Sequence, residues 1–227
     1  MPQNEKERLD DIVRVLEFAH IVDELKCRLR AGWENWSVQA DRLESVAEHC
    51  FSALILAICL HPLHPDSGRI DINKVLKMLI LHEIGETIIG DMTPLDAGYE
   101  DKAGIEHQAW RKLLSGMPLE NEWYDLLIEF DAHETPESRF AYHIDKLDAE
   151  KTLKWYYDSG EMPSLSQCMA RNSKIGNNPQ VRELVEKGAK TPLDIWYADE
   201  YVELRDDPFF MQVLSVIREK DMGKLPL

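Results

Sequence analysis

Hydrophobic residues recur along most of the chain at intervals of three and four, the spacing of one face of an α-helix. In residues 8–27 this face consists of Leu9, Ile12, Val13, Leu16, Ala19 and His20. No convincing stretch alternates apolar and polar residues, the pattern that predicts a half-buried strand. The pattern therefore predicts an all-α fold.

A capping box marks the start of one of these helices. Ser45 at the cap position and Glu48 three residues later predict a helix over residues 46–60. This helix carries His49 in its first turn. Because capping accounts for Glu48, we assign that glutamate to the helix end.

A strongly apolar helix is predicted next, over residues 72–90, with Asp71 at its start and Gly90 at its end. Three further segments share the helical spacing: 101–117, 119–133 and 136–157. Thr135 followed by Pro136 supplies the N-cap and the first helical position of the last one. The sequence thus predicts a bundle of helices.

The C-terminal part, residues 161–227, shows weaker periodicity. Its Asn, Gly and Pro residues at 172–179 predict a loop, before a short helix at 180–188 and a last helix at 208–219. No repeat or low-complexity linker separates this part from the rest. We expect one domain, with a core over 1–160 and a C-terminal helical and loop extension packed on it.

The charge of the chain narrows the range of partners. Its 227 residues include 26 Lys and Arg against 42 Asp and Glu, a net charge of −16. Such a surface repels polyanions, so we expect neither a nucleic-acid polymer nor a membrane as partner. A small phosphorylated ligand stays compatible, because a metal ion or one arginine reverses the potential locally.

The cysteines and the N-terminus point to a cytoplasmic protein. The four cysteines form no C-x-x-C pair and are too few for a disulfide framework. The chain is charged from residue 5 onward and shows no apolar signal region, and its longest apolar run, residues 51–60, is short for a membrane span. We therefore expect a soluble protein with reduced thiols.

Titratable residues inside the apolar segment 72–90 are the clearest candidates for chemistry. In a continuous helix, His82 and Glu86 share a face, and Glu83 is rotated by about 100° from His82. The preceding turn is apolar, so this face is partly buried, and buried imidazoles and carboxylates need a partner. Two imidazoles and two carboxylates suit Mn, Fe, Co, Ni or Zn better than Ca. His49, Asp91 and Asp145 are the other candidates.

Three separated motifs carry a resemblance to a known family. ESVAEH, HEIGETIIGDMTP and TPESRFAYHIDKLDA resemble the HD-domain phosphohydrolases, in particular their 5'-deoxynucleotidase branch, over roughly residues 8–157. The resemblance implies an HD-domain helical bundle and one divalent metal ion, which is Mn, Co, Ni, Zn, Fe or Mg. It implies four metal ligands: His49, His82, Glu83 and Asp145. Glu83 replaces the Asp of the family's name-giving pair.

The resemblance also implies catalytic and substrate-binding residues. The E-x-x-x-G-D motif falls on Glu86 and Asp91, and the Arg-x-Gly-Trp loop falls on Arg30 and Trp33. The implied reaction releases phosphate from (deoxy)ribonucleoside 5'-monophosphates, and the implied assembly is a homodimer. For residues 161–227 the resemblance implies nothing.

This chemistry suits the residue types themselves. A divalent ion neutralises phosphoryl charge and lowers the pKa of water, and Arg30 can hold a phosphoryl oxygen with its planar fork. Glu86 can orient or deprotonate the attacking water, and Asp91 can contact a sugar hydroxyl or protonate the leaving oxygen. Trp33 offers a flat wall that would crowd a 2'-hydroxyl.

Three other interpretations stay open. Glu83 motivates a non-catalytic module that binds metal and nucleotide, although Glu86, Asp91 and Arg30 argue for turnover. A helical bundle can also hold a di-metal oxygenase site, but the other histidines form no Glu-x-x-His repeat for a second ion. The substrate of a hydrolase can be a different phosphorylated nucleotide.

Overall fold

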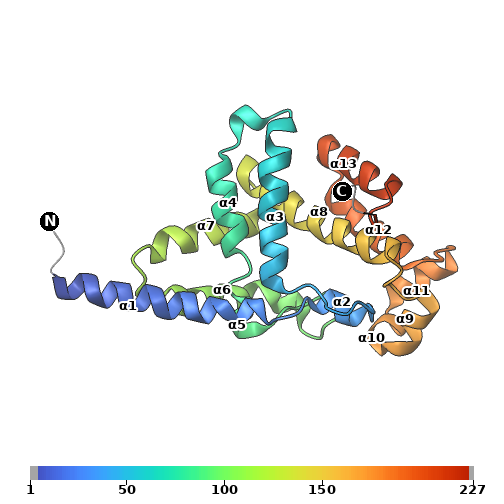
Figure 1. Ribbon diagram of the computed structural model, residues 1–227, viewed down its shortest axis with the longest axis horizontal. Helices are drawn as coiled ribbons and strands as arrows, with labels where there is room; N and C mark the ends of the chain where they lie inside the picture. Colours follow the sequence, from blue (N-terminus) through green and yellow to red (C-terminus); the bar gives the residue numbers. More distant parts are fainter. Residues whose placement is uncertain (1–4, 225–227) are drawn as a thin grey trace.

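The structure is built from helices (Figure 1). This computed structural model describes residues 5–224, the side chains of residues 199–203 excepted. Within the described range there is no strand, only an isolated bridge between Leu29 and Ser45. The prediction of an all-α fold is confirmed.

The long helix α8 (Pro136–Asp158) runs through the middle of the molecule (Figure 1). The helices that pack against it are α3 (Val46–Leu60), α4 (Ile72–Leu81), α7 (Glu120–Ala132), α12 (Pro192–Glu203) and α13 (Pro208–Glu219). The side chain of Thr135 caps its first turn, followed by Pro136 as predicted. Because other helices pack around α8, side chains on several of its faces lie in the interior of the protein.

Helix α3 begins and ends where the sequence predicts. Ser45 Oγ accepts the Glu48 N–H at 3.3 Å, and the Glu48 carboxylate accepts the Ser45 N–H at 2.9 Å. By length and composition alone, Val46–Leu63 also qualifies as a membrane span, and 28% of this window is buried. Helix α3 packs along α4 and α8 with one face. The cap fixes the first turn so that His49 is fully buried.

The segment 72–90 is not the continuous helix that the sequence predicts. Helix α4 ends at Leu81, a turn follows, and α5 (Glu86–Ile89) begins after it. In the turn, the Glu86 N–H bonds the Glu83 carbonyl three residues back at 3.0 Å, which tightens the backbone. A Cβ at Gly85 would lie 2.9 Å from the Trp110 Nε1 on α6 (Lys102–Leu114), so this close approach requires glycine.

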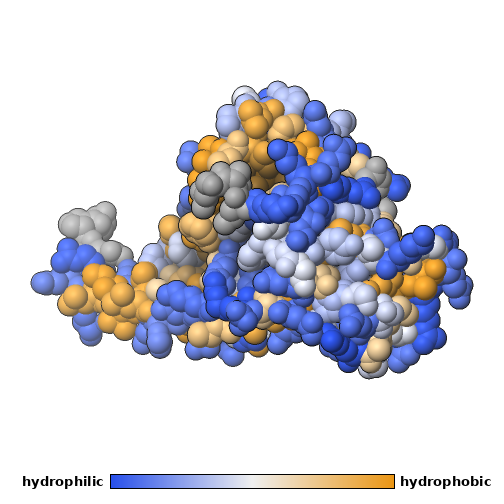
Figure 2. All heavy atoms as spheres, turned by 45° about the vertical axis from the view of Figure 1, so that its right-hand side comes forward, coloured by the Kyte–Doolittle hydropathy of each residue, from blue (hydrophilic) through white to orange (hydrophobic). Residues whose placement is uncertain are grey.

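Helix α1 (Glu5–Val22) forms an arm along one side of the molecule (Figure 1). It starts three residues before the predicted helix, and a 3-10 turn over Asp23–Lys26 continues it. No residue of α1 is buried. Figure 2 shows hydrophobic residues gathered along this arm, and the large ones that are exposed are Leu9, Ile12, Val13, Val15, Leu16 and Ile21.

The C-terminal part is more helical than the sequence predicts. It contains α9 (Leu165–Arg171), α10 (Ser173–Gly176) and α11 (Pro179–Glu186) before α12 and α13. The predicted loop at 172–179 is therefore wrong over α10, where Asn172 caps the helix by accepting the Lys174 N–H. Helix α12 was not predicted, whereas α13 matches its predicted range.

Two hydrophobic clusters form the core, and α12 contributes to both. Tyr197 belongs to the larger cluster around α3, α4 and α8, and Ile195 belongs to a second cluster with Trp33 and Leu153. Trp33 lies on α2 (Ala31–Asn35), a short helix in a segment that the sequence predicts as a loop. Helix α12 therefore lies beside the segment that carries Arg30.

Candidate metal centre and its cavity

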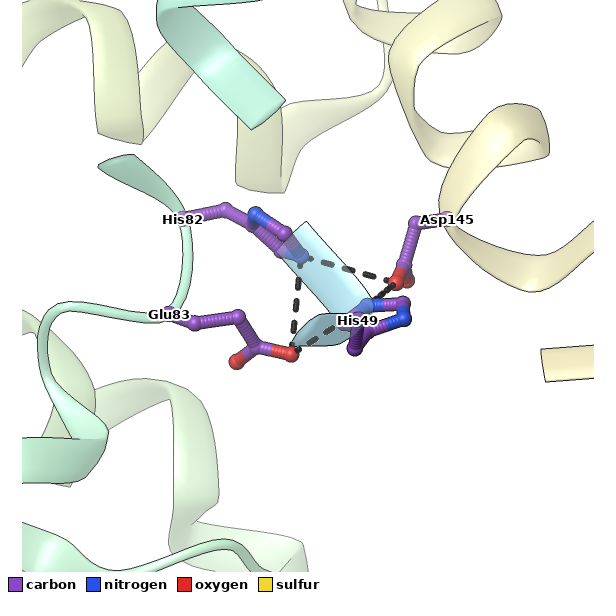
Figure 3. A group of neighbouring side chains, drawn as sticks. All are labelled: His49, His82, Glu83 and Asp145. Carbon is purple, nitrogen blue, oxygen red and sulfur yellow. Dashed lines mark hydrogen bonds and ion pairs between the residues drawn. The ribbon is translucent and has the colours of Figure 1, made fainter. Parts of the chain in front are cut away.

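Four of the predicted site residues meet at one point (Figure 3). His49 comes from the first turn of α3, His82 from the end of α4, Glu83 from the turn after it, and Asp145 from the middle of α8. One ligand atom from each residue lies within 4.8 Å of the corresponding atoms of the other three. The tight turn after α4 lets two consecutive residues face the same centre.

The spacing of these atoms suits a single ion. The His49 Nε2 lies 2.9 Å from Asp145 Oδ1 and 3.7 Å from Glu83 Oε1. The His82 Nε2 lies 3.4 Å and 3.5 Å from the same two oxygens. Ligand atoms held about 2.1 Å from one ion in tetrahedral or octahedral geometry lie roughly 3.0–3.4 Å apart. The four side chains therefore need little movement to bind one metal ion.

Both imidazoles are oriented by their other nitrogen. The His49 Nδ1 donates to Asp148 Oδ2 at 2.9 Å, and the His82 Nδ1 donates to the Leu79 carbonyl at 2.9 Å. These bonds leave Nε2 of each ring directed at the centre, as metal-binding histidines require. The His82 Nε2 is buried and has no hydrogen-bond partner, which is the state of a ligand atom that a metal would satisfy.

Opposite charges within the cluster stabilise one another and shift the pKa values of its residues. Burial alone lowers the pKa of His49, but hydrogen bonds to Asp145 and Asp148 outweigh it and raise that pKa to about 9. Burial alone raises the pKa of Glu83, yet His82 and Arg30 lower it to about 2. The carboxylates are therefore ionised, and the centre attracts positive charge.

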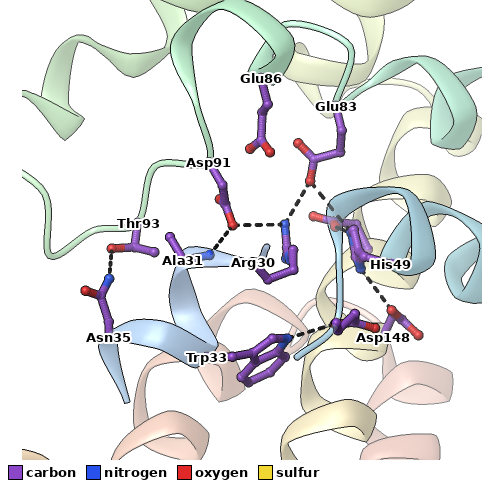
Figure 4. A network of polar contacts seen from close by, with 12 residues as sticks. Arg30, Ala31, Trp33, Asn35, His49, Glu83, Glu86, Asp91, Thr93 and Asp148 are labelled. Carbon is purple, nitrogen blue, oxygen red and sulfur yellow. Dashed lines mark hydrogen bonds and ion pairs between the residues drawn. The ribbon is translucent and has the colours of Figure 1, made fainter. Parts of the chain in front are cut away.

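Arg30 and Asp91 lie on the other side of Glu83 (Figure 4). The Arg30 Nη1 is 3.0 Å from Glu83 Oε1 and 4.0 Å from Asp91 Oδ2. Asp91 also accepts the Ala31 N–H at 2.7 Å, which fixes the start of α2 to the segment after α5. The structure thus brings both residues to the metal centre, as the resemblance implies.

Glu86 lies beside the centre, with 1% of its surface exposed. Neither carboxylate oxygen has a hydrogen-bond partner, and the nearest cation is Lys102, whose Nζ lies 3.9 Å from Oε1. Burial, together with the charges of Glu83 and Asp91, raises the pKa of Glu86 well above its usual range. Glu86 is therefore a carboxyl group whose environment favours its protonated form.

A cavity of about 420 Å³ opens onto the centre. Its walls include His82, Glu83, Asp145, Arg30 and Asp91, whereas His49 and Glu86 lie behind them. This volume is within the range of small-molecule sites. The cavity therefore gives a small ligand direct access to His82, Glu83 and Asp145 of the candidate centre.

Trp33 also lines this cavity, but it is almost completely buried. Only 1% of its surface is exposed, and its Nε1 donates to Glu44 Oε2 at 2.8 Å. The sequence predicts Trp33 as a wall for the sugar. In the structure its indole packs against Trp196 and Tyr156, so little of it is exposed to the cavity.

Sequence reasoning did not identify Asp148 and Lys102. Asp148 lies one helical turn after Asp145, a spacing that placed it on the same face of α8 and was a usable signal. Lys102 lies on α6 and reaches the cavity between Glu86 and Glu106, at 3.9 Å and 3.4 Å. No local pattern marks Lys102, because its role depends on the packing of α6 against α5.

Comparison with known proteins supports the same kind of site. A family model described as "HD domain" matches residues 22–181. A human protein named 5'-deoxynucleotidase HDDC2 is 26% identical over 178 residues, which cover 76% of this chain and 83% of the human protein. The Dictyostelium discoideum protein of the same name is 32% identical over 139 residues, or 59% of this chain and 72% of that protein.

A solved structure shows a related fold. The PH0347 protein from Pyrococcus horikoshii OT3 superposes with a TM-score of 0.63 at 25% sequence identity, covering 89% of this chain and 97% of that one. The match extends well beyond the 22–181 range of the family model. Most of the helical arrangement is therefore shared.

Proposed function

The chain belongs to the HD domain family, a family of metal-dependent phosphohydrolases, and from this premise we propose that it is a 5'-nucleotidase. Its substrates would be deoxyribonucleoside and ribonucleoside 5'-monophosphates, from which it releases inorganic phosphate. The observation that carries this proposal is the four-residue metal centre at the wall of a cavity that also holds Arg30. The names of the human and Dictyostelium relatives point to the same substrate class.

The metal would be held by His49, His82, Glu83 and Asp145. When bound, a divalent ion supplies Lewis-acid neutralisation of phosphoryl charge and a lowered pKa for water. The buried, unpartnered Nε2 of His82 and the spacing of the four ligand atoms fit such an ion. The donor set of two imidazoles and two carboxylates suits a transition metal or zinc.

Cationic side chains in the cavity would bind the phosphate. Arg30 reaches the centre with its guanidinium 3.0 Å from Glu83, and Lys102 and Lys146 also line the cavity. Their charges offset the carboxylates, so that a dianionic phosphomonoester can enter an otherwise acidic site. A planar guanidinium additionally fixes the orientation of a phosphoryl group through paired hydrogen bonds.

Glu86 and Asp91 would handle protons and hydroxyl groups. The raised pKa of Glu86 makes its carboxylate a stronger base, so in its ionised form it can accept a proton from water and, once protonated, return it during the reaction. Asp91 is held by the Ala31 N–H and lines the cavity, so it can accept a hydrogen bond from a sugar hydroxyl or donate a proton to the leaving oxygen. Either role of Asp91 is compatible with its position.

Glu83 in place of aspartate is compatible with metal binding. Its longer side chain brings Oε1 within 3.7 Å of His49 Nε2 and 3.5 Å of His82 Nε2. This geometry suits a metal ligand, which a working centre and the alternative, a module that binds nucleotide without turnover, both require. That alternative predicts metal and nucleotide binding with no phosphate release.

A metal and substrate panel tests the proposal. The metal-stripped protein is assayed for phosphate release with Mn, Co, Ni, Zn, Fe or Mg against nucleoside mono-, di- and triphosphates. We expect a transition metal to support hydrolysis of 5'-monophosphates. Release from triphosphates alone would assign another substrate class, and nucleotide binding without any release would establish the binding module.

The proposed assembly is a homodimer. Helix α1 buries none of its own residues although its apolar side chains include Leu16, 64% exposed, and Leu9, 54% exposed. Of the described hydrophobic residues of α1, only Phe18 and Val22, near its end, pack against the core. A helix with so few packed neighbours is marginal in water, so a second copy that covers its exposed apolar face would stabilise it. Light scattering in solution measures the mass of the assembly, and a monomer at assay concentration would contradict the proposal.

A further inference from the structure

Trp196 of helix α12 forms part of the cavity wall, although it lies outside residues 22–181 that match the HD domain. Its indole stacks on that of Trp33, with ring centroids 5.3 Å apart and an interplanar angle of 15°. It also lies against Gly32, where an added Cβ would come within 3.6 Å of the indole. The C-terminal part thus contributes a rigid aromatic group to the cavity beside Arg30.

Trp196, rather than Trp33, is placed to meet a ligand in this part of the cavity. Trp33 is 1% exposed because its neighbours enclose it, Trp196 on one face and Tyr156 at its edge. Trp196 is only partly buried, and Trp36 meets it at a tilt of 56° that leaves it uncovered by a second parallel ring. An indole that is held by stacking on one face and lines the cavity is a preorganised platform for a flat ligand.

A second aromatic group in the cavity is less suited to this task. The ring of Tyr142 on α8 already contacts His133, with centroids 3.8 Å apart, and the Lys146 ammonium lies 5.2 Å from its centre. Tyr142 is also one helical turn from the metal ligand Asp145, where the phosphate would bind. The cavity thus offers a charged end for phosphate and an indole wall for an aromatic group.

We propose that Trp196 is a specificity-determining residue that contacts the nucleobase of the substrate. This inference rests on the proposed function, because it assumes that the charged end of the cavity holds the 5'-phosphate. The base would lie against the indole while Arg30, three residues before Trp33, holds the phosphate. Residues beyond the HD domain match would then select nucleotides over smaller phosphomonoesters.

The first test compares 2'-deoxyadenosine 5'-monophosphate with 2-deoxyribose 5-phosphate, which lacks the base. Since aromatic stacking of one base is worth about 1–3 kcal/mol, Trp196→Ala should lower the ratio of the two kcat/KM values by roughly 5- to 150-fold, mainly through KM. Trp196→Phe should restore most of it. Trp155→Ala is the matched control, because Trp155 is 43% exposed and does not line the cavity.

The outcomes of this test are distinct. The inference is overturned if Trp196→Ala leaves the ratio unchanged, whether both activities stay the same or both fall equally. If both fall equally, Trp196→Phe shows whether the protein is misfolded, because this variant keeps an aromatic ring in the packed position. A fall in the ratio with Tyr142→Ala in place of Trp196→Ala also overturns it and places the base at the other aromatic group.

A second test does not depend on catalysis. We expect 2'-deoxyadenosine, without phosphate, to quench the tryptophan fluorescence of the wild type and to quench Trp196→Phe much less. If the wild type releases no phosphate but this difference is present, the proposed function fails and the contact with the base stands. Equal quenching in the two proteins overturns the contact, whatever the enzyme hydrolyses.

Discussion

Asp148 is expected to control metal affinity although it is not placed to bind the metal itself. Its Oδ2 accepts the His49 Nδ1–H at 2.9 Å, and its Oδ1 accepts from Ser52 Oγ at 2.7 Å and lies 2.9 Å from Lys151 Nζ. The side chain is fully buried, so water cannot replace these contacts. In Asp148→Asn, the amide can accept from only one of the two sides and turns an N–H donor toward the other.

The size of the effect follows from the role of such partners. Groups that orient metal-binding histidines typically contribute 10–100-fold in metal affinity, or about 1.4–2.7 kcal/mol. We therefore expect the dissociation constant for the activating metal to rise by roughly this factor in Asp148→Asn. Titration against a chromogenic chelator measures it, with thermal melting of the metal-free protein as a check on folding.

Ser52→Ala provides the matched control. It removes one donor to Asp148 but keeps the carboxylate and its bond to His49, so we expect a much smaller loss of affinity. Wild-type affinity in Asp148→Asn would show that His49 does not depend on this orientation. An equal loss in both variants would show that packing around α3 and α8, and not the bond to His49, sets the affinity.

Two further predictions concern the turn after α4. Glu83→Ala should lose metal, because it removes the oxygen that faces both imidazoles, whereas Glu83→Asp should keep metal with a changed metal preference. The measurement is the metal content after dialysis, and full metal content in the alanine variant would show that Glu83 is not a ligand. Glu86→Ala should lower phosphate release by ~10²–10⁴ while metal stays bound. Steady-state kinetics check this, and a near wild-type kcat would exclude Glu86 from the proton-transfer step.

The sequence by itself determined the helices whose ends are marked by local chemistry. The capping box of Ser45 and Glu48, and Thr135 followed by Pro136, specify their helix starts because each cap is built from residues within one turn. The motif order likewise identified the residues that meet at the centre. Asp148 was within reach of the same reasoning, since it follows Asp145 by one helical turn.

Only the tertiary structure decided how α4 ends and what surrounds the cavity. The helix ends at Leu81, and in the turn that follows Gly85 packs against Trp110 of α6, a contact that no local periodicity encodes. Trp196 reaches Gly32 and Trp33 through the packing of α12 on the core. Local sequence specifies capping and amphipathic faces, whereas contacts between distant helices depend on the whole core. The four proposed metal ligands come from three such helices and were predicted because their motifs resemble a known family, whereas no motif marked Trp196.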